Sequence, residues 1–227
     1  EEEYNARRNQ ILDVAQRYIY TKGYEQMSIQ DILNDLQISK GAFYHYFDSK
    51  STLLEALLER IMEGVLQLVQ PIVEDENMPC LEKINRFFSL VGTWKTTQKT
   101  FMLGLLTVWY TDNNALTRQK LQSMMIKKIS PVFSQIIRQG ILEGVLDTPF
   151  PDQIAEIILL IFQGLGEYLS ELLVHPEQGD GALQRSERLI AAYTAALERL
   201  IGAPSNSLIL MDANIIKVWF SPEGENQ

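Results

Sequence analysis

The chain has 227 residues, of which 46% are hydrophobic and 22% are charged, and its net charge is −9. This composition is typical of one or two globular domains with a sizeable core, and it excludes an intrinsically disordered chain. The single cysteine, Cys80, excludes an internal disulfide framework and a Cys-rich zinc site, and it favours a reducing, cytoplasmic location.

Short helices are predicted in the first part of the sequence. Apolar residues recur at helical spacing between Ile11 and Ile19, and Gly23 follows as a helix stop. Ser28 is placed to cap a second helix, and Ser39 is placed to cap a third. Only a few residues separate the second and third helices, which is the length of a helix-turn-helix connection.

The remaining sequence also indicates helices. A long fourth helix is predicted from about Ser49 to Gln70, with Asp48 or Ser49 as its cap, and the acidic, proline-flanked stretch 71–79 is predicted to be a loop. Five further helices are predicted near residues 80–95, 98–111, 113–139, 151–174 and 182–201, with breaks at 148–151 and 175–181. The expected fold class is therefore all-α.

Two apolar stretches stand out in the second half of the sequence. Near the end of the sequence, the β-prone runs Leu208–Met211 and Ile215–Phe220 flank Asp-Ala-Asn, which predicts either a small β-hairpin or an extended apolar arm. The most apolar stretch, residues 154–169, is interrupted by polar and acidic residues and is shorter than the ~20 residues that a membrane span needs. No membrane association is expected.

The stretch ISKGAFYHYFDSK, residues 38–50, combines aromatic and polar groups that separate onto two faces of a helix. One face carries aromatic side chains that can pack in a core: Phe43, Tyr46 and Phe47. The other face and its flank carry groups that suit a nucleic-acid phosphate backbone: Lys40, Gly41, Tyr44 and His45. Ser28 and Lys50 begin neighbouring helices and can add phosphate contacts.

Three features of this region occur together: a glycine–aromatic pair, a serine that begins the second helix, and a Ser-Lys-Gly-x-x-Tyr-x-x-Phe-x-x-Lys block. They are formed by Gly23, Tyr24, Ser28, Ser39, Lys40, Gly41, Tyr44, Phe47 and Lys50. With this pattern, residues 10–58 resemble the DNA-binding domain of the tetracycline-repressor (TetR) family of transcriptional regulators, and residues 142–165 resemble the family's regulatory domain more loosely. The resemblance implies a dimeric, ligand-responsive regulator, most often a repressor, that binds a pseudo-palindromic double-stranded DNA operator. No cofactor is expected.

The resemblance also indicates residues for three sites. DNA contacts are expected from Ser28, Lys40, Gly41, Tyr44, His45 and Lys50. A small, largely apolar inducer is expected near Trp94, Met102, Trp109, Phe133, Phe162 and Gln163. A four-helix bundle between two copies is expected from Ile154, Ile158, Ile161, Leu165, Leu189, Tyr193 and Leu200. The alternative for the first set is an ordinary solvated surface, and for the other two it is a plain helical core.

The expected domains are a helix-turn-helix DNA-binding domain at 1–55, a helical ligand-binding and dimerisation domain at 56–204, and an apolar tail at 205–227. Residues 1–55 carry six basic and nine acidic residues, although DNA-binding domains are usually basic. This balance favours an alternative: a helical small-molecule or protein-binding module with weak or lost DNA binding. An enzyme is not expected, because the sequence has no P-loop, dinucleotide fingerprint or nucleophile elbow. No metal site is expected, because no ligand cluster accompanies His45 or His175.

Overall fold

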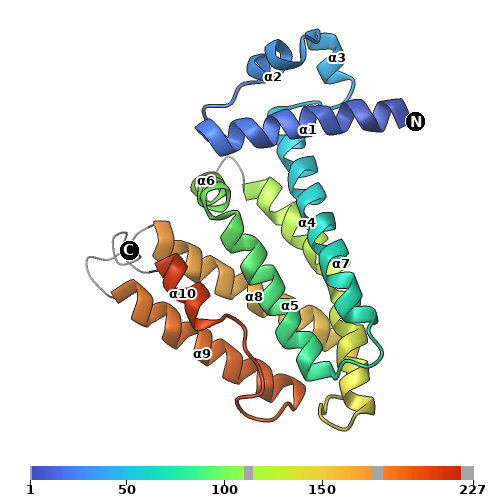
Figure 1. Ribbon diagram of the computed structural model, residues 1–227, viewed down its shortest axis with the longest axis vertical. Coiled ribbons are helices and arrows are strands. Elements are labelled where there is room, and N and C mark those ends of the chain that lie inside the picture. Colours follow the sequence, from blue (N-terminus) through green and yellow to red (C-terminus); the bar gives the residue numbers. More distant parts are fainter. Residues whose placement is uncertain (1, 110–114, 175–180, 221–227) are drawn as a thin grey trace. The chain divides into compact units, whose positions relative to one another are not determined.

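The computed structural model describes residues 2–109, 115–174 and 181–220, and all regular structure within these ranges is helical (Figure 1). The helices are α1 (Glu2–Lys22), α2 (Ile29–Leu36), α3 (Lys40–Tyr44), α4 (Lys50–Glu74), α5 (Cys80–Thr97), α6 (Lys99–Trp109), α7 (Ala115–Leu142), α8 (Pro151–Val174), α9 (Gly181–Ile201) and α10 (Ala213–Phe220). The all-α prediction is confirmed. The chain divides into two compact units, unit 1 from residues 1–64 and 99–121, and unit 2 from residues 65–98 and 122–227.

Unit 1 has a core that includes a helix from much later in the sequence. The apolar stripe of α1 buries Ile11 and Leu12 against Phe43 of α3 and against α4. The first turns of α6 also belong to this core, because α6 packs against α1 and both Phe101 and Leu105 are buried in the same cluster. The helix-turn-helix is thus completed by a segment about fifty residues beyond it.

Side-chain caps determine where the short helices of unit 1 begin. Ser28 and Asp31 form a reciprocal capping box at the start of α2, in which the Asp31 N–H donates to Ser28 Oγ at 3.1 Å. At the start of α3, the Ala42 N–H donates to Ser39 Oγ at 3.1 Å. Between them, Gln37 ends α2 in the left-handed conformation with a φ of 51°, which turns the chain sharply into α3.

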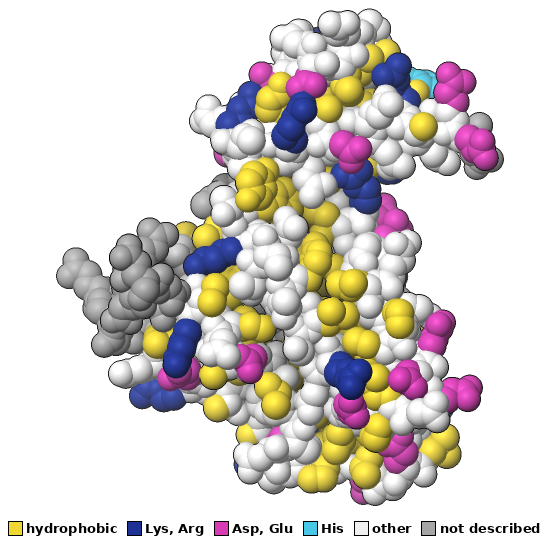
Figure 2. Space-filling view, in the orientation of Figure 1, with side chains coloured by type: hydrophobic (Ala, Val, Ile, Leu, Met, Phe, Trp, Pro, Cys, Tyr) yellow, Lys and Arg dark blue, Asp and Glu magenta, His cyan; other side chains and the backbone are white. Residues whose placement is uncertain are grey.

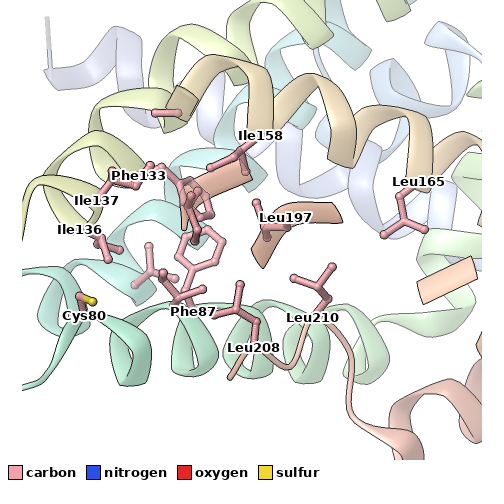
Figure 3. Close-up of a cluster of buried hydrophobic side chains, with 14 of the residues drawn as sticks. Cys80, Phe87, Phe133, Ile136, Ile137, Ile158, Leu165, Leu197, Leu208 and Leu210 are labelled. Carbon is pink, nitrogen blue, oxygen red and sulfur yellow. The ribbon is translucent and has the colours of Figure 1, made fainter. Parts of the chain in front are cut away.

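Unit 2 is built around one large apolar core, part of which Figure 3 shows. The core takes side chains from α5, α7, α8 and α9 and from the last turns of α4. The prediction of a loop from residue 71 is wrong for residues 71–74, because α4 continues through Pro71 to Glu74. Val69 and Val73 lie one turn apart and are both buried in the core of unit 2, which favours continuing the helix over the loss of one backbone hydrogen bond at Pro71.

The tail contains a helix, so the predicted β-hairpin is wrong. Residues 213–220 form α10, which packs against α5 and α9. Ile216 and Phe220, four residues apart, are both buried, and this spacing matches a helix face. Asp212 starts the helix, because its carboxylate accepts the N–H of Asn214 at 2.8 Å. The local β propensity of the run Ile215–Phe220 is therefore overridden by tertiary burial.

The segment between α9 and α10 is held by two polar side chains. Glu198 on α9 is buried, and its carboxylate accepts the N–H groups of Asn206 and Leu208, each at 3.0 Å. Asn85 on α5 donates to the Ser207 carbonyl at 2.9 Å and accepts the N–H of Ile209 at 2.8 Å. Figure 3 shows Leu208 beside Phe87 in the core. The tail is an integral part of unit 2.

Candidate nucleic-acid interface

Helix α3 ends at Tyr44, and together with residues 45–47 it separates its side chains onto two faces as the sequence predicts. Phe43 and Phe47 are buried in the core of unit 1, and Tyr46 is half-buried against the same core. The outer side remains open: Tyr44 is 40% exposed, and Lys40, Gly41 and His45 are also exposed. Four of the six predicted DNA-contacting residues therefore lie together on one solvent-facing surface.

Close approach to this surface is unobstructed at Gly41. A Cβ atom built at Gly41 would meet only the Ser39 hydroxyl, at 3.9 Å. The ammonium group of Lys40 lies 5.8 Å from the centroid of the Tyr44 ring. Positive charge and the Tyr44 ring therefore lie near a residue that has no side chain, an arrangement that a DNA backbone can approach closely.

Lys50 and Ser28 flank the loop that precedes α2. The Lys50 ammonium donates to the Glu25 carbonyl at 3.2 Å and lies 4.3 Å from the centroid of the Tyr24 ring. Partial burial lowers the pKa of Lys50. The Ser28 hydroxyl donates to the Asp31 carboxylate at 2.7 Å, so a hydrogen bond from this hydroxyl to DNA would replace that bond.

Four acidic side chains of unit 1 form ion pairs within the unit. The carboxylate of Asp31 pairs with Lys22 at 2.7 Å, and that of Asp13 pairs with Arg60 at 2.7 Å. Two further pairs join Arg17 to Asp35 and Lys120 to Glu55. Figure 2 shows basic and acidic side chains close to one another on the visible face of residues 2–64. Two of the four paired cations, Arg60 and Lys120, lie outside residues 1–55, so the net charge of that range omits part of the positive charge of unit 1.

Sequence reasoning overlooked two aromatic residues near this surface. The Tyr24 ring lies under the Lys50 ammonium, and burial raises the pKa of Tyr24 to about 12. The Tyr4 ring contacts the rings of His45 and Tyr46. Tyr24 is part of the glycine–aromatic pair, which is a local signal that points to this position. Tyr4 lies more than forty positions from its partners, so no local pattern indicates it.

Comparisons with known proteins agree with this geometry. Residues 11–57 match the protein family described as "Bacterial regulatory proteins, tetR family". Residues 108–182 match the family described as "Tetracyclin repressor-like, C-terminal domain". The HTH-type transcriptional regulator TtgR of Pseudomonas putida (strain DOT-T1E) is 30% identical over 154 residues, which are 64% of this chain and 73% of that protein. The chain belongs to the TetR family.

Further TetR-family similarities extend over most of the chain. The HTH-type transcriptional repressor DhaR of Mycobacterium sp. (strain GP1) is 21% identical over 158 residues, covering 69% of this chain and 79% of that protein. A crystal structure of a TetR transcription regulator from Haloarcula marismortui ATCC 43049 has the same fold, with a TM-score of 0.62 and 18% identity, covering 87% of this chain and 97% of that one. The chain is a helix-turn-helix transcriptional regulator of a non-enzymatic family.

The residues predicted to bind an inducer do not form one group in this TetR-family regulator. Phe133 and Phe162 lie in unit 2 in a cluster of aromatic rings with Phe87 and Phe88. Trp94 and Gln163 are half-buried side chains of unit 2, whereas Met102 packs against the core of unit 1. The side chain of Trp109 lies outside the described residues. The structure thus brings Phe133 and Phe162 together.

A separate open groove of about 1080 Å³ lies in unit 2, and none of the six predicted inducer residues lines it. Its charged lining residues are Glu74, Glu76, Lys83, Arg138, Glu143, Asp152 and Glu156. Both cations have partners, because Lys83 donates to the Val73 carbonyl at 2.7 Å and Arg138 pairs with Asp152 at 2.5 Å. Among the described residues, no group of three or more His, Cys, Asp or Glu side chains could hold a metal ion.

Helix α8 is unusually apolar for its exposure. Among the described residues, it is the one helix that is long and apolar enough to cross a membrane. Its most apolar stretch of 18 residues has a mean hydropathy of 1.7, and 22% of that stretch is buried. Within unit 2 it contributes Ala155 and Leu169 to the core. Of the predicted dimer residues, Ile158 and Leu165 are buried within the subunit, and the remaining ones, Ile154, Ile161, Leu189, Tyr193 and Leu200, are half-buried.

Proposed function

We propose that the chain is a cytoplasmic, dimeric repressor that binds a pseudo-palindromic DNA operator through α3 and is released by a small, largely apolar inducer. One observation carries the DNA-binding part: residues 40–47 bury Phe43 and Phe47 and leave Lys40, Tyr44 and His45 exposed around Gly41, where close approach is unobstructed. Two such heads, one from each copy, would enter successive major grooves. The functional division into domains 1–55 and 56–204 is part of this proposal.

Selection from random duplex DNA at low salt tests the proposal. The parent protein should enrich a pseudo-palindrome, and its binding should weaken steeply as salt rises, with log K falling by ~0.9 per phosphate neutralised. Tyr44→Ala and Lys50→Ala should each weaken binding at least about tenfold, the scale of one charge-assisted hydrogen bond. Tyr20→Ala is a matched control, because Tyr20 is an exposed tyrosine on α1 with no expected DNA contact.

The acidic balance of residues 1–55 favours a second candidate, a helical binding module with weak or lost DNA binding. The two candidates differ in a measurable way. A folded dimer that enriches no sequence and shows no salt-dependent affinity for any duplex would support the module and refute the repressor.

The dimer proposal rests on the outward side of α8. Three large apolar side chains there are exposed, namely Ile157 at 41%, Leu160 at 53% and Tyr168 at 57%. Exposed apolar area of this kind on a soluble protein indicates a protein interface, and α9, which packs along α8, would complete a four-helix bundle with a second copy. Leu160→Glu should therefore yield monomers in light scattering, whereas Leu142→Glu, at an 88% exposed leucine of α7, should leave the dimer intact.

The inducer proposal rests on the aromatic cluster of Phe87, Phe88, Phe133 and Phe162 in unit 2, next to which an apolar ligand can be buried. A ligand that releases the protein from DNA should quench or shift the fluorescence of Trp94. Phe162→Ala should weaken this ligand without changing operator affinity. Equal ligand affinity in the parent and in Phe162→Ala would show that the ligand binds away from the aromatic cluster.

A further inference from the structure

Three rings form a cluster where α1 meets the end of α3. The centroids of Tyr4 and Tyr46 are 4.7 Å apart, those of His45 and Tyr46 are 5.1 Å apart, and those of Tyr4 and His45 are 5.6 Å apart. Both contacts of the imidazole are edge-to-face, at interplanar angles of 81° and 83°. Edge-to-face packing is a favourable arrangement for aromatic rings. The His45 ring is therefore contacted from two sides, by Tyr4 of α1 and by its neighbour Tyr46.

The cluster is anchored on its inner side. Tyr46 is half-buried and packs against the core of unit 1, so its ring is a fixed support. Tyr4 is 39% exposed and rests on that support. Arg8, one turn further along the same face of α1, places its guanidinium 5.4 Å from the centroid of the Phe47 ring. Two contacts one turn apart thus set the register of α1 against the segment that follows α3.

We propose that Tyr4 is a positioning residue for DNA binding, which holds the exposed imidazole of His45 in one orientation on the outer surface of α3. This inference rests on the proposed DNA-binding function. An exposed side chain at the end of a short helix samples several rotamers, and ordering it on binding reduces affinity. Tyr4 removes that penalty in advance, because it orders His45 in the DNA-free protein. Tyr4 is thereby an additional determinant of operator affinity that lies on α1, outside the helix-turn-helix.

The test measures operator affinity of Tyr4→Ala, Tyr4→Phe and Tyr20→Ala, each with and without His45→Ala. Tyr4→Ala should weaken binding about three- to tenfold, the range expected for one aromatic pair. Tyr4→Phe retains the ring and should bind like the parent, as should Tyr20→Ala. In the His45→Ala background, Tyr4→Ala should cause no further loss, because Tyr4 acts through the imidazole.

Each contrary result has a defined meaning. Unchanged affinity in Tyr4→Ala, or an equal loss with and without His45, would overturn the positioning role. A loss in Tyr4→Phe as large as in Tyr4→Ala would also overturn it, since the hydroxyl would then act directly. A parent protein that selects no duplex would refute the proposed function itself, whereas a parent that binds equally well without Tyr4 would refute only the role of Tyr4.

A readout without DNA tests the ring contact independently. In the free protein, Tyr4→Ala should shift the His45 ring-proton resonances, because the edge-to-face neighbour is removed, while Tyr20→Ala should not. Identical His45 spectra in the parent and in Tyr4→Ala would refute the contact on which the inference depends.

Discussion

Phe101→Ala should destabilise the DNA-binding head, although Phe101 lies far outside the helix-turn-helix sequence. Its side chain is 2% exposed and belongs to the same buried cluster as Leu12 and Phe43. Truncating a fully buried phenylalanine costs about 3–5 kcal/mol, because apolar contacts are lost and a cavity remains. Small domains are stable by about 5–15 kcal/mol, so this loss removes a large fraction of the stability of unit 1.

Hydrogen exchange resolved by peptide is the appropriate assay, because it separates unit 1 from unit 2. Peptides within 11–47 that exchange by unfolding of unit 1 should exchange about 10²–10⁴ times faster in Phe101→Ala, following the free-energy change. Leu116→Ala is the control, because Leu116 lies in unit 1 with 65% of its side chain exposed and should leave these rates unchanged. Unaltered protection of peptides 11–47 in Phe101→Ala would refute the assignment of α6 to the core of the head.

Three further predictions concern single groups. Gln37→Gly should stabilise unit 1 by about 0.5–1 kcal/mol in urea unfolding, because glycine adopts the φ of 51° without steric strain. Hydrogen bonds from Lys22 and Ser28 hold the pKa of Asp31 well below its usual range. The stability that Asp31 confers should therefore be complete above about pH 4 and should be lost as the pH falls further. Asp31→Asn should differ in stability from the parent mainly above that pH. Burial raises the pKa of Cys80 to about 12, so iodoacetamide at about pH 8.5 should alkylate the thiol only after unfolding. The contribution of Cys80 to stability should fall as the pH rises above about 8.5, where the thiol ionises in the unfolded chain.

Each of these predictions has a result that would contradict it. Gln37→Ala keeps the Cβ atom and should not stabilise the protein, so equal gains for alanine and glycine would point away from backbone strain. A constant stability difference between Asp31→Asn and the parent from pH 7 down to pH 3 would exclude the proposed linkage. Alkylation of Cys80 in the native protein at the rate of an unfolded peptide would show that the thiol is accessible.

Features that depend on nearby residues could be predicted from the sequence. The capping serines, Ser28 and Ser39, and the two faces of α3 depend on contacts within one or two helical turns. The limits of α5, α7, α8 and α9 follow from the sequence to within a few residues for the same reason, because proline and glycine breaks and apolar stripes are local signals. The burial of Phe43 and Phe47 confirms that the aromatic residues of this stretch serve the core.

Features that depend on distant partners could not be predicted. Phe101 has an ordinary helical surrounding in the sequence, and only the packing of α6 on α1 shows that it belongs to the head. Tyr4 meets His45 across more than forty residues. The run Ile215–Phe220 has strong local β propensity, but no partner strand is available among the described residues, and α5 and α9 offer an apolar surface that a helix can cover. In each case, tertiary contact outweighs the local signal.

The inducer-controlled release proposed above would act across the places where the chain passes from one unit to the other. It crosses within α4 after Gly64, between α5 and α6 after Gln98, and within α7 after Leu121. Two crossings therefore lie inside continuous helices, and the third leads directly into α6, which carries Phe101 into the core of unit 1. A change in unit 2 can reach unit 1 through these contiguous segments without any separate transmitting element. Under that proposal, the inducer would have to bind the DNA-free state more tightly than the DNA-binding state, and this difference in affinity would limit how far it can weaken DNA binding.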